Sequence, residues 1–378
     1  MSVEEGIVAA YLVGCIVIGV LASRRVLGSN DEYWVAGRSI GPVVNAIAIM
    51  AALASGGSIV GVMGLAYARG MPATLALFAG AVVGFPLAAM LVARPLRNFG
   101  QFTITDFLGW RFPSAIVRIG VPIVIVISFT VYVVAQLKAA GLTAQVLLGW
   151  EYNTALVVST VVFVAYVSVG GMLAITWTDV VQGALMLALV LGAAALLAVD
   201  AGGPTTVLAR AATEAPALGK MGSTPMASGL GLFVIWAAAI PVIPHIVMRV
   251  FTAKDARGAR LSLNLAMIAY SAIILAAVLV IVPIGKLEFP ALKDADSVFH
   301  HVVEGHFPHW LRGIAVAAVI AAVMSTTDAL LLACSSAIAH DLIEKNAGRA
   351  LSPKAMGRVN VGVVWLVGGV AMLLFFFK

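Results

Sequence analysis

Ten long apolar runs occupy most of this 378-residue chain. An α-helix needs about 20 mostly apolar residues to cross the hydrocarbon core of a bilayer. Charged side chains make up 11% of the chain, against about 25% in soluble proteins, and one water-soluble core cannot bury the 62% that is hydrophobic. We therefore expect an all-α integral membrane protein. The expected spans are 5–22, 41–69, 73–93, 115–147, 154–170, 180–199, 227–250, 262–285, 311–339 and 357–377.

Positive charges are concentrated in alternate turns between these runs. Most of the 23 Lys and Arg residues fall in the turns 24–38, 94–118, 249–260 and 345–358. Membrane proteins keep such turns on the cytoplasmic side. We therefore expect an outside N-terminus in the cell (inner) membrane, and we assign the net charge of +6 to topology and not to nucleic-acid binding. No basic segment precedes the first run, so we expect it to be a span and not a cleaved signal.

Side chains that could perform covalent chemistry are sparse. Cys15 and Cys334 lie inside apolar runs, so we expect free thiols without a disulfide or metal role. The four histidines of the linker 286–310 lack metal-ligand spacing, and we expect a solvated loop there. The sequence presents no nucleophile–base pair and no phosphate-binding loop. We therefore expect a transporter without a cofactor, and not an enzyme.

Two of the expected spans contain helix-breaking residues near their middle. Residues 51–58 read Ala-Ala-Leu-Ala-Ser-Gly-Gly-Ser, and each glycine costs a helix about 1 kcal/mol relative to alanine. Pro241 and Pro244 interrupt the seventh run, and each removes a backbone donor. Transporters built from inverted repeats place their substrate and ion site at such paired breaks. The alternative is that Gly and Pro are simply common in membrane helices.

Hydroxyl groups lie deep in the ninth run. Ser325 and Thr326 stand next to each other there, and Asp328 follows as a carboxylate that needs a partner or a cavity. Hydroxyl and carbonyl oxygens suit a hard cation such as sodium, so the carbonyls of Ala51 and Ala54 could complete a cage with these two hydroxyls. The alternative is that the hydroxyls bond to their own helix or join two helices.

Three further polar residues have two interpretations each. Asp179 starts the sixth run, either as a helix N-cap facing water or as an ion-handling carboxylate. Lys138, in the fourth run, is expected to extend to the outer interface rather than attract an anionic substrate. His245 follows Pro244 and is expected to cap carbonyls that the break sets free, rather than to titrate during transport.

Short motifs are spread along nearly the whole chain, at residues 31–38, 58–61, 66–70, 103–108, 170–174 with 178–179, and 324–328. Together they resemble the motifs of the sodium:solute symporter family, whose members transport proline, pantothenate, acetate and sugars. The resemblance implies a leucine-transporter-like inverted repeat with one extra N-terminal helix, about ten transmembrane helices in all. On this division, 5–22 is the leading helix, 41–199 the first five-helix repeat and 227–378 a second repeat that lacks its last helix. Family members usually continue further, so we expect a shortened form.

The resemblance also implies which residues form the ion sites. It places sodium between two segments of the chain, at Ala51, Ala54, Ala322, Ser325 and Thr326. It matches Asp179 to an acidic residue linked to a second cation or to cation release.

The expected substrate site lies between the two breaks and has an apolar side. Leu53 stands where proline symporters carry an aspartate and sugar symporters an asparagine, and Ile240 stands where proline symporters carry a tyrosine. Ser58 occupies the position of the sugar-contacting glutamine, and residues 243–252 are most similar to acetate and other monocarboxylate permeases. Backbone donors freed at the first break would suit a short carboxylate. The expected contacts are Ser55, Gly56, Gly57, Ser58, Trp236, Ile240 and Pro244.

These observations predict a sodium-coupled symporter that imports a small organic anion, with acetate or another short monocarboxylate as the first candidate. The expected partners are sodium, this anion and the lipid bilayer. The coupling would be a binding free energy shared by two sites in an alternating-access cycle. The alternatives are a symporter for pantothenate or proline, the symporter-like membrane half of a signalling protein, and an inactive fragment.

Overall fold

The computed structural model describes residues 2–23, 30–168, 171–220, 224–349 and 351–376. Within these ranges the chain is helical apart from short connections and one isolated bridge between Ile40 and Ala253. Eight helices are long and apolar enough to cross a membrane, and a bent pair adds a ninth among the described residues. The expected all-α membrane architecture is confirmed.

Each expected span is occupied by one helix or one interrupted pair. These helices are α1 (Val3–Ser23), α3 (Pro42–Leu53) with α4 (Val62–Arg69), α5 (Met71–Leu87), α8 (Ala115–Leu148), α9 (Tyr152–Val167), α10 (Met172–Asp200), α12 (Met226–Ala239) with α13 (Pro244–Thr252), α14 (Ala256–Ala276), α17 (His309–Ser336) and α18 (Pro353–Phe376). Residues 169–170, at the end of the fifth expected span, lie outside the described residues. α10 begins well before residue 180, which moves Asp179 from the helix start into its interior.

Short helices and π-helical segments connect these elements. The short ones are α2 (Asn30–Val35), η1 (Ala36–Arg38), α6 (Ala93–Phe99), α7 (Ile104–Arg111), α11 (Pro204–Glu214), η4 (Pro216–Leu218), α15 (Val282–Glu288), η6 (Ala295–Ser297) and α16 (Val298–His306). The π-helical ones are η2 (Gly57–Gly61), η3 (Ala88–Val92), η5 (Ala277–Ile281) and η7 (Ala337–Asn346).

Helix starts in the turns of one end carry side-chain caps. Thr103 accepts the amide of Asp106 at the start of α7, and Ser114 accepts that of Ile116 at the start of α8. Asp255 caps α14 in the same way. Such caps satisfy amides that have no partner within the helix, and each contributes about 1 kcal/mol.

α17 is the central helix of the molecule. It packs against α8, α10, α1, α3 and α18, and its side chains from Ala315 to Ser336 are buried. The neighbouring helices α3 and α10 approach each other closely at Gly183. A Cβ there would lie 2.8 Å from Ile47 Cγ2 and 3.2 Å from Ala51 Cβ, so only glycine fits without a shift. This packing places the first break beside α10 and α17.

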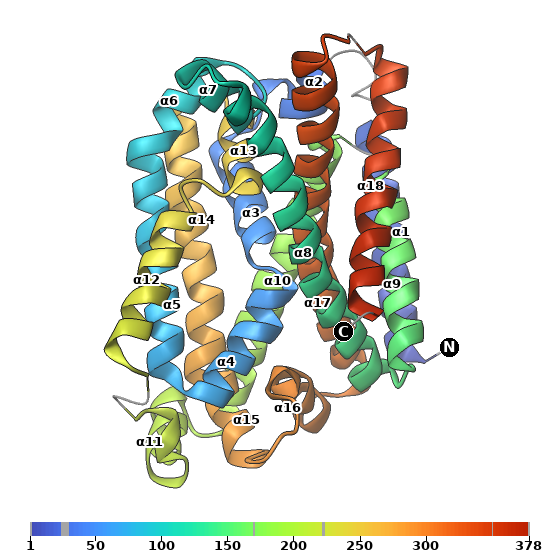
Figure 1. Cartoon of the computed structure of the whole chain (residues 1–378). Helices are drawn as coiled ribbons and strands as arrows, with labels where there is room; N and C mark the ends of the chain where they lie inside the picture. Colours follow the sequence, from blue (N-terminus) through green and yellow to red (C-terminus); the bar gives the residue numbers. More distant parts are fainter. Residues whose placement is uncertain (1, 24–29, 169–170, 221–223, 350, 377–378) are drawn as a thin grey trace.

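The turns lie at two opposite ends of the helix array (Figure 1). α2, α7 and the connection from η7 to α18 lie at one end, and α11, α15 and α16 lie at the other. The expected inner turns therefore share one end as far as they are described, since residues 24–29 lie outside the described residues.

Lys138 extends to the opposite end as expected, because its side chain is 47% exposed and its Nζ lies 2.6 Å from Asp296 Oδ2. The expectation for His300 at the same end was wrong. His300 is buried, and its Nε2 lies 2.9 Å from Thr143 Oγ1, so this histidine is not part of a solvated loop. Both contacts tie α8 to the connection before α17.

Cysteine labelling tests which end faces the cytoplasm. Thr205 and Ser352 are exposed at opposite ends, and both native cysteines are buried, so background labelling will be low. We expect Thr205→Cys to react with an impermeant maleimide in intact cells, and Ser352→Cys to react only after permeabilisation, because positive turns stay in the cytoplasm. The reverse pattern would mean that the N-terminus lies inside.

Candidate functional site

The break after α3 releases two carbonyls from the helix ladder. α3 and the following helical segment are bent by 61° with respect to each other. A regular helix would pair the amide of Ser55 with Ala51 O and the amide of Gly56 with Ala52 O. Instead, Ser55 N donates to Leu53 O at 2.7 Å, and Gly56 N donates to a side-chain oxygen of α8 at 3.1 Å.

Hydroxyls of α17 donate hydrogen bonds to these two carbonyls. Ser325 Oγ donates to Ala51 O at 2.9 Å and to Ala322 O at 3.3 Å. Thr326 Oγ1 donates to Ala52 O at 3.0 Å. All five residues are fully buried. Five oxygen atoms from two helices therefore gather in a region that excludes water.

The sequence predicted four of these residues and missed one. Adjacent residues on a helix diverge by about 100°, yet both Ser325 and Thr326 reach the irregular backbone, as expected. Thr326 contacts Ala52 and not Ala54. Ala54 caps α3 with a ψ of 61° and carries neither hydroxyl contact. The hydroxyls join two helices here, and the same oxygens are of the kind that hard cations prefer.

Most backbone donors at the break are not free in this conformation. Besides the amides of Ser55 and Gly56, that of Ser58 is also taken, by Ser55 O at 2.9 Å. The Ser58 hydroxyl donates to Leu53 O at 2.9 Å. The expectation that these donors stand free for a carboxylate was therefore wrong for these three amides in this arrangement, because the turn and α8 supply acceptors.

The second break separates α12 from α13. Pro241 and Pro244 withhold amide donors from the preceding turn, and α13 starts with Pro244 in its first turn. Ile240 is fully buried against Gly84 of α5, where an added Cβ would lie 2.7 Å from Ile240 Cβ. Trp236 is half-buried one turn earlier, and its carbonyl faces the same glycine.

Buried polar side chains lie between the two breaks. Gln136 of α8 supplies the oxygen that accepts Gly56 N, and its Nε2 has no hydrogen-bond partner among the described residues. His245 lies edge-on to Phe129 and Tyr132, with ring centroids 5.4 and 6.2 Å away. Neither ring nitrogen of His245 has such a partner, so the expected cap on freed carbonyls was wrong. The sequence could have indicated Gln136 as a functional residue, because it is a polar side chain inside an apolar run.

Asp179 forms a buried ion pair that the sequence did not predict. The guanidinium of Arg249, on α13, donates to Asp179 Oδ2 and, at 2.6 Å, to Thr176 Oγ1. The side chains of Asp179 and Arg249 are 0% and 1% exposed, which excludes a water-facing N-cap. Asp179 Oδ1 has no hydrogen-bond partner among the described residues.

Asp179 also lies close to the first break. Gly183, which contacts Ala51, follows it by one helical turn on the same face of α10. Asp179 is therefore about 6 Å along α10 from the glycine that contacts Ala51, on the side of α2 and α7.

Comparisons with known proteins identify the family of this chain. The sequence model of the sodium:solute symporter family matches residues 33–378. The chain is 31% identical to the sodium/proline symporter of Escherichia coli (strain K12), over 94% of this chain and 74% of that protein. It is 30% identical to the high-affinity proline transporter of Bacillus subtilis (strain 168), over 93% of this chain and 77% of that protein.

Solved structures show the same fold. A Na⁺-coupled sialic acid symporter in a substrate-bound, outward-open state superposes with a TM-score of 0.83 at 17% identity, covering all of this chain and 82% of that one. A nucleobase-cation-symport-1 family transporter in a closed conformation superposes with a TM-score of 0.59 at 18% identity, covering 92% of this chain and 78% of that one. The expected leucine-transporter-like fold is confirmed.

Removing one partner of the Asp179–Arg249 pair tests its contribution to stability. Asp179→Asn leaves a buried guanidinium without a counter-charge, and we expect the free energy of unfolding to fall by about 3–5 kcal/mol. The double variant Asp179→Leu, Arg249→Leu should lose much less. The measurement is the thermal unfolding midpoint of the purified protein. Asp200→Asn is the control, because this exposed carboxylate ends the same helix. An unchanged midpoint for Asp179→Asn would contradict the ion pair.

Proposed function

The chain belongs to the sodium:solute symporter family, and on that premise we propose that it imports a short monocarboxylate, such as acetate, together with sodium. It is a multi-pass membrane protein and a sodium-coupled transporter, not an enzyme. The observation that carries the ion part of the proposal is the pair of carbonyls, Ala51 O and Ala52 O, that the break directs at hydroxyls of α17.

Sodium binds at this oxygen cluster. In the arrangement described, the protons of Ser325 and Thr326 point at carbonyls. Rotation of each hydroxyl turns a lone pair inward in place of the proton, so that a cation replaces the hydrogen bonds with ion–oxygen contacts. Ala51, Ala52 and Ala322 supply carbonyls in this arrangement. The predicted ligand Ala54 joins them only if the break rearranges.

Asp179 serves cation release or a second cation. Its Oδ1 has no hydrogen-bond partner among the described residues, and the residue lies one helical turn from Gly183, which contacts Ala51, toward the end where the positive turns gather. An ion leaving the cluster on that side passes a carboxylate whose other oxygen is held by Arg249. The ion pair thus keeps the carboxylate in place without neutralising both oxygens.

The substrate carboxylate binds between the breaks. Gln136 Nε2 and a ring N–H of His245 are buried donors that have no other hydrogen-bond partner among the described residues. Phe129, Tyr132 and Leu53 complete a surrounding that carries no negative charge. An ammonium group would need such a charge, so these side chains favour a simple carboxylate over a zwitterion.

In this proposal Trp236, Ile240 and Pro244 provide the apolar side that suits a short alkyl chain. The amides of residues 55–58 become available only when the break rearranges, since most of them now have protein acceptors. The cation and the substrate use the same few residues of backbone, which is how binding of one favours binding of the other.

Proline is the second candidate. It is supported by the relatives named sodium/proline symporter and high-affinity proline transporter, at about a third of positions identical. Proline also carries a carboxylate and a compact apolar ring, but its charged amine needs an acceptor at the break.

Thr326→Ala tests the sodium site. Loss of one oxygen ligand from a water-free site costs about 1–3 kcal/mol, or roughly 5- to 150-fold in affinity. We expect the sodium concentration for half-maximal uptake to rise by this factor at equal protein levels in the membrane. Thr326→Ser keeps the oxygen and should be mild. The measurement is sodium-dependent uptake in cells expressing the complete gene product.

The next residue offers a matched control for this test. Thr327 Oγ1 donates to Val323 O of its own helix at 2.7 Å, so Thr327→Ala should leave sodium dependence unchanged. If Thr326→Ala and Ser325→Ala lower only protein stability, the hydroxyls merely join the two helices, and the sodium site is elsewhere.

Competition for uptake tests the substrate. We expect labelled acetate to be taken up, and its uptake to be inhibited by propionate and pyruvate more than by proline or galactose. Gln136→Glu keeps the acceptor for Gly56 N but removes the donor, so acetate uptake should fall about 10-fold or more. Transport of proline alone would replace acetate as the substrate and leave the sodium site intact.

A further inference from the structure

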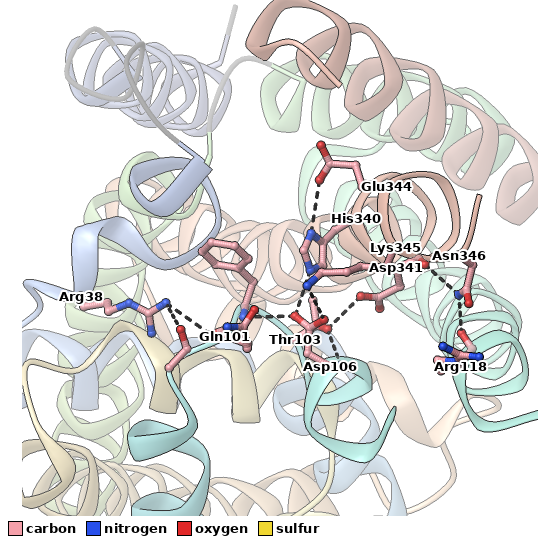
Figure 2. Close-up of polar contacts among 12 residues, drawn as sticks. Arg38, Gln101, Thr103, Asp106, Arg118, His340, Asp341, Glu344, Lys345 and Asn346 are labelled. Carbon is pink, nitrogen blue, oxygen red and sulfur yellow. Dashed lines mark hydrogen bonds and ion pairs between the residues drawn. The ribbon is translucent and has the colours of Figure 1, made fainter. Parts of the chain in front are cut away.

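A second polar cluster joins two helices at the end of the molecule where the positive turns gather (Figure 2). Asp106 lies on α7, and His340 and Asp341 lie on η7, which continues α17. His340 Nε2 is 2.9 Å from Asp106 Oδ2, and Thr103 Oγ1 donates to Asp341 Oδ1 at 2.8 Å. One nitrogen or oxygen atom from each of Asp106, His340 and Asp341 lies within 4.8 Å of the other two.

These side chains are buried, and one oxygen has no partner. The side chains of His340 and Asp106 are 4% and 8% exposed, and Asp341 is 2% exposed. Asp341 Oδ2 has no hydrogen-bond partner among the described residues. A buried carboxylate oxygen without a hydrogen bond lowers the stability of the fold unless a cation or a donor satisfies it. The sodium and substrate sites use none of these groups.

The histidine is oriented as metal-binding histidines are. Its Nδ1 lies 3.3 Å from Glu344 Oε2, and the ring of Phe102 meets it edge-on at 5.3 Å. A carboxylate at one ring nitrogen fixes the ring and directs the other nitrogen at the ion. Here the directed nitrogen is Nε2, on the side of Asp106.

A cationic side chain already lies beside Asp106. Lys345 Nζ is 3.8 Å from Asp106 Oδ1, and its side chain is 53% exposed. This ammonium can therefore turn into solvent when another cation arrives.

We propose that Asp106, His340 and Asp341 bind a divalent transition-metal ion such as Zn²⁺ or Mn²⁺. One imidazole nitrogen with two carboxylates suits these ions, whereas Mg²⁺ and Ca²⁺ prefer sites made only of oxygen. Ligand atoms about 2.0–2.2 Å from an ion lie roughly 3–3.5 Å apart, which the cluster reaches by a small contraction. The ion joins α7 to the continuation of α17. This inference does not depend on the transported solute.

Metal titration of the purified full chain tests the site. After chelator treatment, Zn²⁺ and Mn²⁺ are added in sodium-containing buffer, with Mg²⁺ for comparison. We expect one Zn²⁺ or Mn²⁺ per chain and a rise in the thermal unfolding midpoint, with no such response to Mg²⁺. Asp341→Asn and His340→Gln should weaken binding about 10- to 100-fold or more.

Two further variants separate this site from others and from loss of folding. Lys345→Met keeps all three ligands and removes a competing charge, so it should bind Zn²⁺ more tightly. His306→Gln is the control, because His306 Nε2 also pairs with a carboxylate, 2.8 Å from Glu288 Oε2, at the opposite end. It should leave binding unchanged.

The proposal is overturned by any of three results. These are absence of stoichiometric binding to the wild-type chain, equal binding by folded Asp341→Asn and His340→Gln variants, and loss of binding in His306→Gln. If the ligand variants do not fold, unchanged or weaker Zn²⁺ affinity in Lys345→Met contradicts it.

Discussion

A backbone group that leaves a helix inside a bilayer must find its partner within the protein, and the rest of this structure depends on that constraint. The break at residues 54–56 frees two carbonyls, which accept hydroxyls of α17, and an amide, which donates to Gln136 of α8. Because the partners are side chains of other helices, the break ties α3 to α8 and α17. The proposed sodium site uses these same partners, so one local irregularity would serve both packing and binding.

At the second break, an ion pair fixes the interrupted helix, whereas hydroxyl groups do so at the first. Arg249 on α13 reaches α10, where Asp179 and Thr176 receive its guanidinium in a region without water. Such a pair contributes little net stability compared with an apolar pair, but loss of either partner is costly. It therefore fixes how α13 sits against α10. Each interrupted helix is thus positioned by polar groups of an uninterrupted one.

α17 connects these features to the end of the molecule where the positive turns gather. It carries the hydroxyls that face the first break, and its π-helical continuation carries His340 and Asp341 against Asp106 of α7. Residues 315–336 are buried, so this helix has few ways to move independently of its neighbours. A contact that holds its end to α7 therefore acts on the same rigid element that carries the candidate sodium ligands.

The sequence by itself determined the membrane location, the spans, the two breaks and the hydroxyl pair at Ser325 and Thr326, because each depends on local composition or on the conformational cost of Gly and Pro. Only the tertiary structure decided that Arg249 meets Asp179, that Gln136 accepts Gly56 N, and that Asp106 meets His340 across 234 residues. The physical reason is that nearly every face of these helices is apolar. Periodicity therefore does not indicate which face meets which neighbour, and close packing at positions such as Gly183 sets the register.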